Sequence, residues 1–149
     1  MDGSLPFIML RQNDWVQQIR YAAAWIFDDR LTRLSDSEFI FSLPFAEKLR
    51  RSSRGSHGEY TDEFFALLCS PKYKKALDAG LLDSCVRTRR ICIRAILSMP
   101  ELDNPQVECQ LMAEPDPFLR SLLLRGLIER DAMTPRIAEH VLILCISSS

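Results

Sequence analysis

Three arginines in the middle of the chain have the spacing of a binding surface. Arg87, Arg90 and Arg94 fall within about 60° of one another when successive helical residues turn by about 100°. Guanidinium groups gathered on one face suit an acidic peptide, a phosphate or a nucleic-acid backbone, because each can form paired hydrogen bonds with an anion. The same spacing is also typical of a solvated helix face. We take these three residues as the candidate partner-binding site.

Residues that could support catalysis or hold a metal are sparse. The two histidines, His57 and His140, have no Cys, Asp or Glu at metal-ligand spacing. Acidic pairs such as Asp28-Asp29 are adjacent, so on a helix they diverge by about 100° and do not converge on one substrate atom. The sequence also contains no glycine-rich phosphate loop and no nucleophile elbow. These patterns predict a protein that is not an enzyme and that uses no metal or cofactor.

Composition and charge favour a globular, helical and cytoplasmic protein. The 149 residues are 47% hydrophobic and include five glycines, a content that suits helices better than a sheet sandwich. Lys and Arg number 19 against 20 Asp and Glu, so the basic excess typical of nucleic-acid binders is absent. The five cysteines include no Cys-x-x-Cys pair, and we expect them to be reduced. No apolar run approaches the roughly 20 residues that span a bilayer, and we expect no signal peptide.

Pairs of a helix-capping residue and a proline mark the starts of several helices. Ser, Asn, Asp and Thr side chains cap the amides of a first turn, and a proline there loses no hydrogen bond. These pairs are Ser70-Pro71, Asn104-Pro105, Asp116-Pro117 and Thr134-Pro135. Ser35 to Glu38 has the pattern of a capping box. Together with the apolar spacing, the marks predict helices over 5–12, 14–33, 36–50, 60–69, 71–79, 83–98, 105–113, 116–130 and 135–146. We expect a flexible, arginine-containing loop at 51–59.

A short pattern recurs along the chain with a spacing typical of helical repeats. Asp83 and Arg87 stand four residues apart, as do Asp116 and Arg120, and the two arginines are 33 residues apart. A looser copy lies at 14–20. This series resembles HEAT repeats, whose second helix typically opens with an aspartate and a Val-Arg pair. Armadillo-like units are a close alternative.

The resemblance implies a single domain, residues 1–149, folded as a short right-handed α-solenoid of antiparallel helix pairs. About four repeats fit the chain, and the second, which contains 51–59, is degenerate. An aspartate at a helix start favours the positive end of the helix dipole. We expect the arginine one turn later to pair with that aspartate or with the aspartate of the adjacent unit. Such a ladder of ion pairs would help to set the register of the repeats.

The functional prediction follows from the fold by analogy. Elongated repeat surfaces bind proteins or peptides because each unit contributes a few side chains to a continuous concave face. We therefore expect a binding scaffold whose partner is a protein or peptide with an acidic segment. One alternative is a nucleic-acid-directed protein related to the HEAT-like DNA-alkylation-repair glycosylases, which use a basic concave face. Another is an immunity or inhibitor protein, for which the size and near-neutral charge are suitable.

The last predicted helix is apolar on every side. Residues 141–146 are six consecutive apolar residues, so burial of one helix face leaves another exposed. A homodimer about a two-fold axis would cover that face, and a docked partner or a longer protein would do the same. The candidate oligomer-interface residues are Val141, Leu142, Leu144 and Ile146.

The two tryptophans have different surroundings in the sequence. Trp25 lies in the run from Ala22 to Phe27, which predicts a buried position in a helix core. Trp15 lies near a predicted helix start, and core packing and base stacking both stay open for it.

Overall fold

Helices make up the fold, and the described part of the chain has no strand. The computed structural model describes residues 4–51, 58–101, 104–139 and 143. Its elements are α1 (Ser4–Arg11), α2 (Gln17–Leu31), α3 (Asp36–Arg50), α4 (Gly58–Leu68), the 3-10 helix η1 (Pro71–Tyr73), α5 (Lys74–Leu81), α6 (Val86–Ser98), α7 (Asn104–Ala113) and α8 (Pro117–Glu129). Residues 135–139 are also helical. The prediction of an all-α protein is confirmed. Among the described helices, none is long and apolar enough to cross a membrane.

Two of the predicted side-chain caps fix the starts of α3 and α8. The Ser35 hydroxyl accepts a hydrogen bond from the Glu38 N–H at 3.4 Å. The Glu38 carboxylate in turn accepts one from the Ser35 N–H at 3.3 Å, which completes the capping box of α3. At α8, the Asp116 carboxylate accepts a hydrogen bond from the Leu119 N–H at 3.0 Å, and Pro117 is the first helical residue. Local sequence therefore sets these two helix starts.

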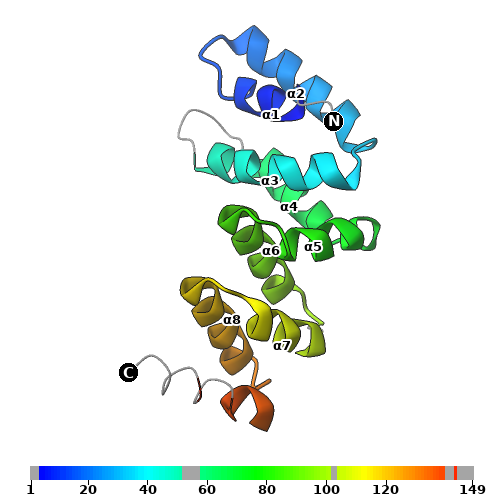
Figure 1. Cartoon of the computed structure of the whole chain (residues 1–149). Helices are drawn as coiled ribbons and strands as arrows, with labels where there is room; N and C mark the ends of the chain where they lie inside the picture. Colours follow the sequence, from blue (N-terminus) through cyan, green and yellow to red (C-terminus); the bar gives the residue numbers. More distant parts are fainter. Residues whose placement is uncertain (1–3, 52–57, 102–103, 140–142, 144–149) are drawn as a thin grey trace. The chain divides into compact units, whose positions relative to one another are not determined.

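The helices group into two compact units, Met1–Ala95 (unit 1) and Ile96–Ser149 (unit 2). In unit 1, α1 packs against α2 and α3, and α3 also contacts α4 and α5 (Figure 1). In unit 2, α7 packs against α8. The expectation of one repeat domain over residues 1–149 stays a prediction.

A column of aromatic rings forms the centre of unit 1. Phe39 stacks on Tyr73 with ring centroids 4.3 Å apart and on Phe64 at 4.5 Å. Phe27 lies 6.0 Å from Phe64, and all four rings are buried. The Tyr73 hydroxyl donates to the Leu31 carbonyl at 3.2 Å, so this buried polar group is satisfied. The rings tie α2, α3, α4 and η1 into one core.

A glycine lets α5 and α6 approach each other closely. A Cβ atom at Gly80 would lie 2.5 Å from the Sγ atom of Cys92, which is closer than real Cβ contacts allow. Both residues are buried. The absence of a side chain at Gly80 is therefore what makes room for the thiol.

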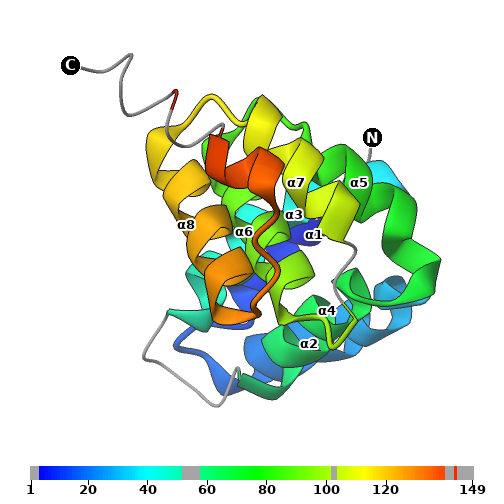
Figure 2. The ribbon, with the colours of Figure 1, turned by 90° about the horizontal axis from the view of Figure 1, so that it is seen from below.

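Unit 2 also has a glycine at a close contact between two helices. A Cβ atom at Gly126 of α8 would lie 2.5 Å from a methyl carbon of Leu97, the last apolar residue of α6. The helical stretch 135–139 lies beside α7 (Figure 2), where Arg136 pairs with Glu108 at 3.5 Å. The buried apolar side chains of the described part of this unit are Ile96, Val107, Leu111, Leu119, Leu123, Leu127 and Ile137.

Candidate partner-binding surface

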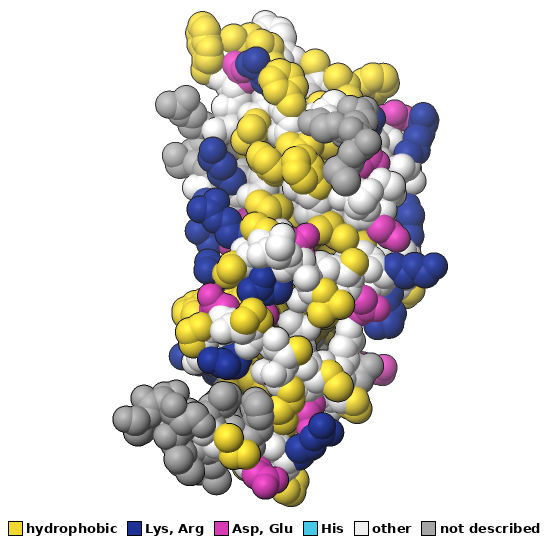
Figure 3. Space-filling model, viewed as in Figure 1, with side chains coloured by type: hydrophobic (Ala, Val, Ile, Leu, Met, Phe, Trp, Pro, Cys, Tyr) yellow, Lys and Arg dark blue, Asp and Glu magenta, His cyan; other side chains and the backbone are white. Residues whose placement is uncertain are grey.

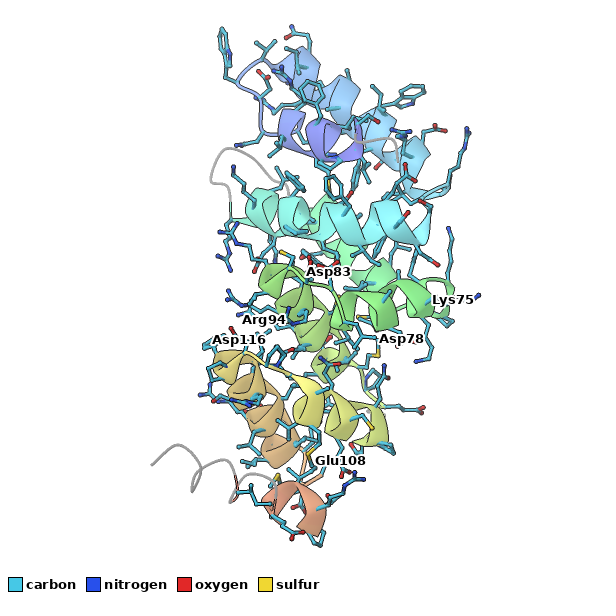
Figure 4. The ribbon with its side chains drawn as sticks, viewed as in Figure 1. Lys75, Asp78, Asp83, Arg94, Glu108 and Asp116 are labelled. Carbon is cyan, nitrogen blue, oxygen red and sulfur yellow. The ribbon has the colours of Figure 1, made fainter. Side chains whose placement is uncertain are left out.

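The same turn precedes α2, α6 and α8. In each, a carboxylate accepts a hydrogen bond from the backbone N–H two residues later, and the helix begins three residues after the acidic residue. The oxygen–nitrogen distances are 3.1 Å for Asp14 and Val16, 2.7 Å for Asp83 and Cys85, and 3.0 Å for Glu114 and Asp116. Because the acidic residue lies in the turn, α2 and α6 begin three residues later than the predicted 14 and 83. Figure 4 labels Asp83 and Asp116 in two of these turns.

An arginine six residues after the acidic residue holds two of the turns. Arg20 donates through Nη1 to the carbonyl oxygens of residues 14 and 15, at 2.9 and 3.3 Å. Arg89 donates through Nη1 to those of residues 83 and 84, at 2.8 and 3.2 Å. Each guanidinium thus bridges two backbone acceptors before the helix, and these charge-assisted bonds are among the stronger ones in proteins.

These contacts correct the spacing predicted for the repeat. The counterpart of Asp83 is Glu114, 31 residues later, and not Asp116. The arginine that contacts the turn before α6 is Arg89, and not Arg87. The expected ion pair between the aspartate and the arginine four residues later is absent from both turns within the described residues. The side chain at the sixth position is long enough to reach the carbonyl oxygens before the helix, as Arg89 does. Arg87, at the fourth position, is exposed instead.

The predicted arginine face of α6 lies at the surface of unit 1. Arg87 and Arg94 are exposed, and Arg90 is partly buried. Figure 4 labels Arg94 on α6. Its Nη1 atom lies 3.6 Å from Oε1 of Glu47 in α3. The same carboxylate oxygen also pairs with Nη2 of Arg51 at 2.7 Å. One acidic side chain, itself only 15% exposed, therefore holds arginines from two helices that are distant in sequence.

The end of α3 extends this surface with two arginines that are not among the predicted site residues. Arg50 pairs with Asp62 at 3.7 Å and lies over the Phe65 ring, 5.7 Å from its centroid. Cations at a helix C-terminus are favoured by the helix dipole, which explains two arginines at this end of α3. Figure 3 shows Lys and Arg side chains gathered along this edge of unit 1. We define the arginine surface as Arg50, Arg51, Arg87, Arg90 and Arg94.

The tryptophans are at the surface, so the prediction of a buried Trp25 is wrong. Trp25 is 74% exposed and Trp15 is 84% exposed. Hydrophobic side chains gather over α1 and α2 in Figure 3, and Phe7 and Tyr21 are exposed there as well. The alanine-rich run that suggested a core has only Ala23 and Phe27 buried, one helical turn apart.

The candidate oligomer-interface residues lie outside the described residues. These are Val141, Leu142, Leu144 and Ile146. Ile143, the described residue within that run, is 54% exposed. The homodimer interface stays a prediction.

Two cysteines of α6 and its preceding turn have opposite thiol chemistry. Cys85 is exposed, and hydrogen bonds from the Thr88 N–H and hydroxyl and the Arg87 N–H hold the pKa of its thiol below the ordinary value. Cys92 is buried, and burial raises the pKa of its thiol to about 12. The described cysteines form no disulfide, and the described residues contain no cluster of His, Cys, Asp and Glu that could hold a metal.

Comparisons with known proteins identify no family for this chain. A scan against protein-family models finds no match, and searches of curated proteins and of solved structures find none either. The function is therefore inferred from the residues and contacts of this chain alone.

Proposed function

We propose that this protein is a non-enzymatic binding scaffold, built as a short right-handed solenoid of HEAT-like repeats, which recognises an acidic segment of a protein partner. The turn shared by α2, α6 and α8 supports the repeat interpretation, because repeated units are expected to begin a helix in the same way. In all three, the carboxylate belongs to the residue three positions before the helix. In this proposal α1–α2, α3–α4, α5–α6 and α7–α8 are the four repeats. In the second, the residues where this turn would lie are outside the described part of the chain. This is the repeat that contains 51–59 and that the sequence predicts to be degenerate.

The observation that carries the binding proposal is the placement of Glu47. Its carboxylate lies between Arg51, which directly follows α3, and Arg94 of α6, at 2.7 and 3.6 Å. The contact supports the proposal, because in it one carboxylate is already shared by two guanidinium groups. Glutamate side chains of a partner would meet Arg87 and the outer part of Arg94 in the same way. Arg is better suited than Lys here because its planar fork matches a carboxylate in two places.

A charge-reversal pair tests the proposal. Arg87→Glu/Arg94→Glu reverses two exposed cations of the arginine surface, and Lys74→Glu/Lys75→Glu makes the same charge change on α5 (Lys75 is labelled in Figure 4). Fluorescence anisotropy would follow a labelled peptide of alternating Glu and Ala. We expect the first variant to weaken binding by about tenfold or more and the second to bind as the parent does.

The same measurement separates the competing partner class. A labelled DNA duplex is titrated at several salt concentrations, since phosphate contacts produce a steep loss of affinity with salt. Tight duplex binding that Arg87→Glu/Arg94→Glu abolishes, with no binding of the acidic peptide, would replace the proposal by a nucleic-acid function. Equal peptide binding by all three proteins would remove the arginine surface from consideration.

A further inference from the structure

A second feature of unit 1 is a cleft where α2, α4 and the start of η1 meet. Its volume is about 400 Å³, within the range of pockets that take small ligands. The residues that line it are Asp28, Leu31, Thr32, Glu63, Leu67 and Lys72. None of them belongs to the arginine surface.

The walls of the cleft are apolar, and its rim is acidic. Leu31 is buried and Leu67 is partly buried, so both present carbon atoms to the cleft. Asp28 and Glu63 are exposed. The one cation, Lys72, donates to the Thr32 carbonyl at 3.2 Å and lies 4.9 Å from the Tyr73 ring centroid. Its ammonium group is therefore already engaged by the protein.

The carboxylates in the cleft differ from their immediate neighbours in sequence. Asp29, next to Asp28, pairs with Arg33 at 3.1 Å. Asp62, next to Glu63, pairs with Arg50 at 3.7 Å. Asp28 and Glu63 make no ion pair or side-chain hydrogen bond with any residue that the structure describes. Within the described part of the chain, the carboxylate outside the cleft has a cation partner on both helices, and the carboxylate that lines the cleft has none.

Aromatic side chains on α2 lead to the cleft. Tyr21, Trp25 and Asp28 are spaced by four and three residues, so they lie along one face of the helix. Tyr21 and Trp25 are both exposed. An exposed tryptophan beside a carboxylate favours a cation, because the face of the indole ring attracts positive charge and the carboxylate pairs with it.

We propose that this cleft binds a lysine or arginine side chain of a basic peptide segment. The aliphatic stem packs against Leu31 and Leu67, and the cationic head pairs with Asp28 and Glu63. Trp25, one helical turn before Asp28 on α2, would cover the stem or the cation of a neighbouring basic residue. The proposal goes beyond the acidic partner of the arginine surface, and it gives unit 1 two sites of opposite charge preference. Either site can fail its test without affecting the other.

The test uses Trp25 as its own reporter. Trp15→Phe leaves Trp25 as the single tryptophan of the chain. Into this protein we would titrate a short blocked alanine peptide with one central arginine, and separately its twin with citrulline, which has the same shape and no charge. We expect the arginine peptide to change Trp25 fluorescence saturably and the citrulline peptide to bind about tenfold more weakly or worse.

Matched variants place the binding in the cleft. Asp28→Asn/Glu63→Gln removes the two cleft carboxylates, and Asp29→Asn/Asp62→Asn removes the two neighbouring ones with the same change in net charge. We expect about a tenfold loss for the first variant and no loss for the second. All four residues are exposed, and a thermal melt of each variant checks that the fold is kept. Equal binding of the two peptides, equal affinities of the two variants, or no saturable change at about 10 mM peptide would overturn the proposal.

Discussion

The helices α2 and α6 begin in the same way but have different surroundings. Both follow an Asp turn held by an arginine at the sixth position. Five, eight and twelve residues after the aspartate, α6 has side chains that are buried or partly buried, whereas all three in α2 are exposed. The residues at these positions are Thr88, Ile91 and Ala95 in α6 and Ile19, Ala22 and Ile26 in α2.

A neighbouring segment accounts for part of the difference. The Sγ atom of Cys69, which follows α4, lies 3.9 Å from the Ala95 carbonyl oxygen and so contacts this face of α6. In unit 2, Gly126 stands twelve residues after Glu114 and is buried against Leu97. The turn is thus set by local sequence, while burial of the face depends on what packs against it. Four predictions test this distinction.

The largest effect is expected at the eighth position. Ile91→Asp places a carboxylate in a site that is 5% exposed, and we expect it to cost more than about 4 kcal/mol of unfolding free energy. Ala22→Asp at the exposed equivalent in α2 should change stability by about 1 kcal/mol or less. Urea titration followed by circular dichroism measures both. If Ile91→Asp does not fold, Ile91→Ala should still lose about 2–5 kcal/mol. Equal losses at the two positions would show that the α2 face is also covered.

The second prediction compares Arg89 and Arg20, which contact the turns before α6 and α2. Their replacement by alanine should give a smaller difference in unfolding free energy. Arg89 is buried, and Arg89→Ala leaves two backbone carbonyls without their charged donor, so we expect a loss of about 2–3 kcal/mol. Arg20 is partly exposed, and water replaces much of its contribution, so Arg20→Ala should cost about 1 kcal/mol. Arg87→Ala serves as the control, since that side chain is exposed and outside the turn. A larger loss of unfolding free energy for Arg87→Ala than for Arg89→Ala would favour the predicted spacing of four residues between aspartate and arginine.

The close approach of α5 and α6 gives a third test. A methyl group at Gly80 would meet the Cys92 Sγ atom at 2.5 Å, so Gly80→Ala should destabilise unit 1 by about 1–3 kcal/mol. Cys92→Ala removes that atom, and the double variant should be more stable than the sum of the two single changes predicts. In α1 the corresponding residue, three before the aspartate, is Arg11. Arg11→Ala should cost about 1 kcal/mol or less, since the Arg11 side chain is itself about half exposed and water weakens its ion pair with Asp14. Strict additivity of Gly80→Ala and Cys92→Ala would contradict the packing argument.

The sequence predicts what depends on neighbours along the chain. The all-α class and the caps at Ser35 and Asp116 follow from side chains that bond within one turn. The six-residue spacing could have been found from Asp14 and Arg20, because the same pair recurs at residues 83 and 89. The alignment of Asp83 and Arg87 with Asp116 and Arg120 favours a spacing of four residues instead.

What depends on distant neighbours was not predictable from one sequence. Trp25 lies in an apolar run, but its exposure is decided by the elements that pack against α2. The arginine surface joins Arg94 to Arg51 through Glu47, and no local pattern links α3 to α6 across that distance. The cleft likewise needs α2, α4 and η1 to meet. The cation partners of Asp29 and Asp62, which distinguish these residues from the cleft carboxylates, include Arg50 from a third helix.

The smallest effect on stability concerns the residue just before each helix, which is Cys85 at α6 and Val16 at α2. Hydrogen bonds from the Thr88 N–H and hydroxyl and the Arg87 N–H lower the pKa of the Cys85 thiol, so its thiolate fraction at neutral pH exceeds that of an ordinary cysteine. We expect iodoacetamide to alkylate Cys85 first and to leave buried Cys92 unmodified, because burial raises the pKa of Cys92 to about 12. Mass spectrometry after timed labelling across a pH series measures each site.

The same chemistry can be moved to α2 if the two turns are equivalent. In a Cys85→Ser background, Val16→Cys places a thiol at the same position, where the backbone amides of the first turn can bond its thiolate. Because Ile19 stands where α6 has Thr88, the hydroxyl donor is missing, so the pKa of the new thiol should be lowered less than that of Cys85. Its alkylation should therefore reach half its maximal rate at a pH between that of Cys85 and that of the unfolded chain in urea. A Val16→Cys thiol that titrates like the unfolded chain would show that the first amides of the two helices differ in geometry. The two turns would then share only the hydrogen bond to the aspartate.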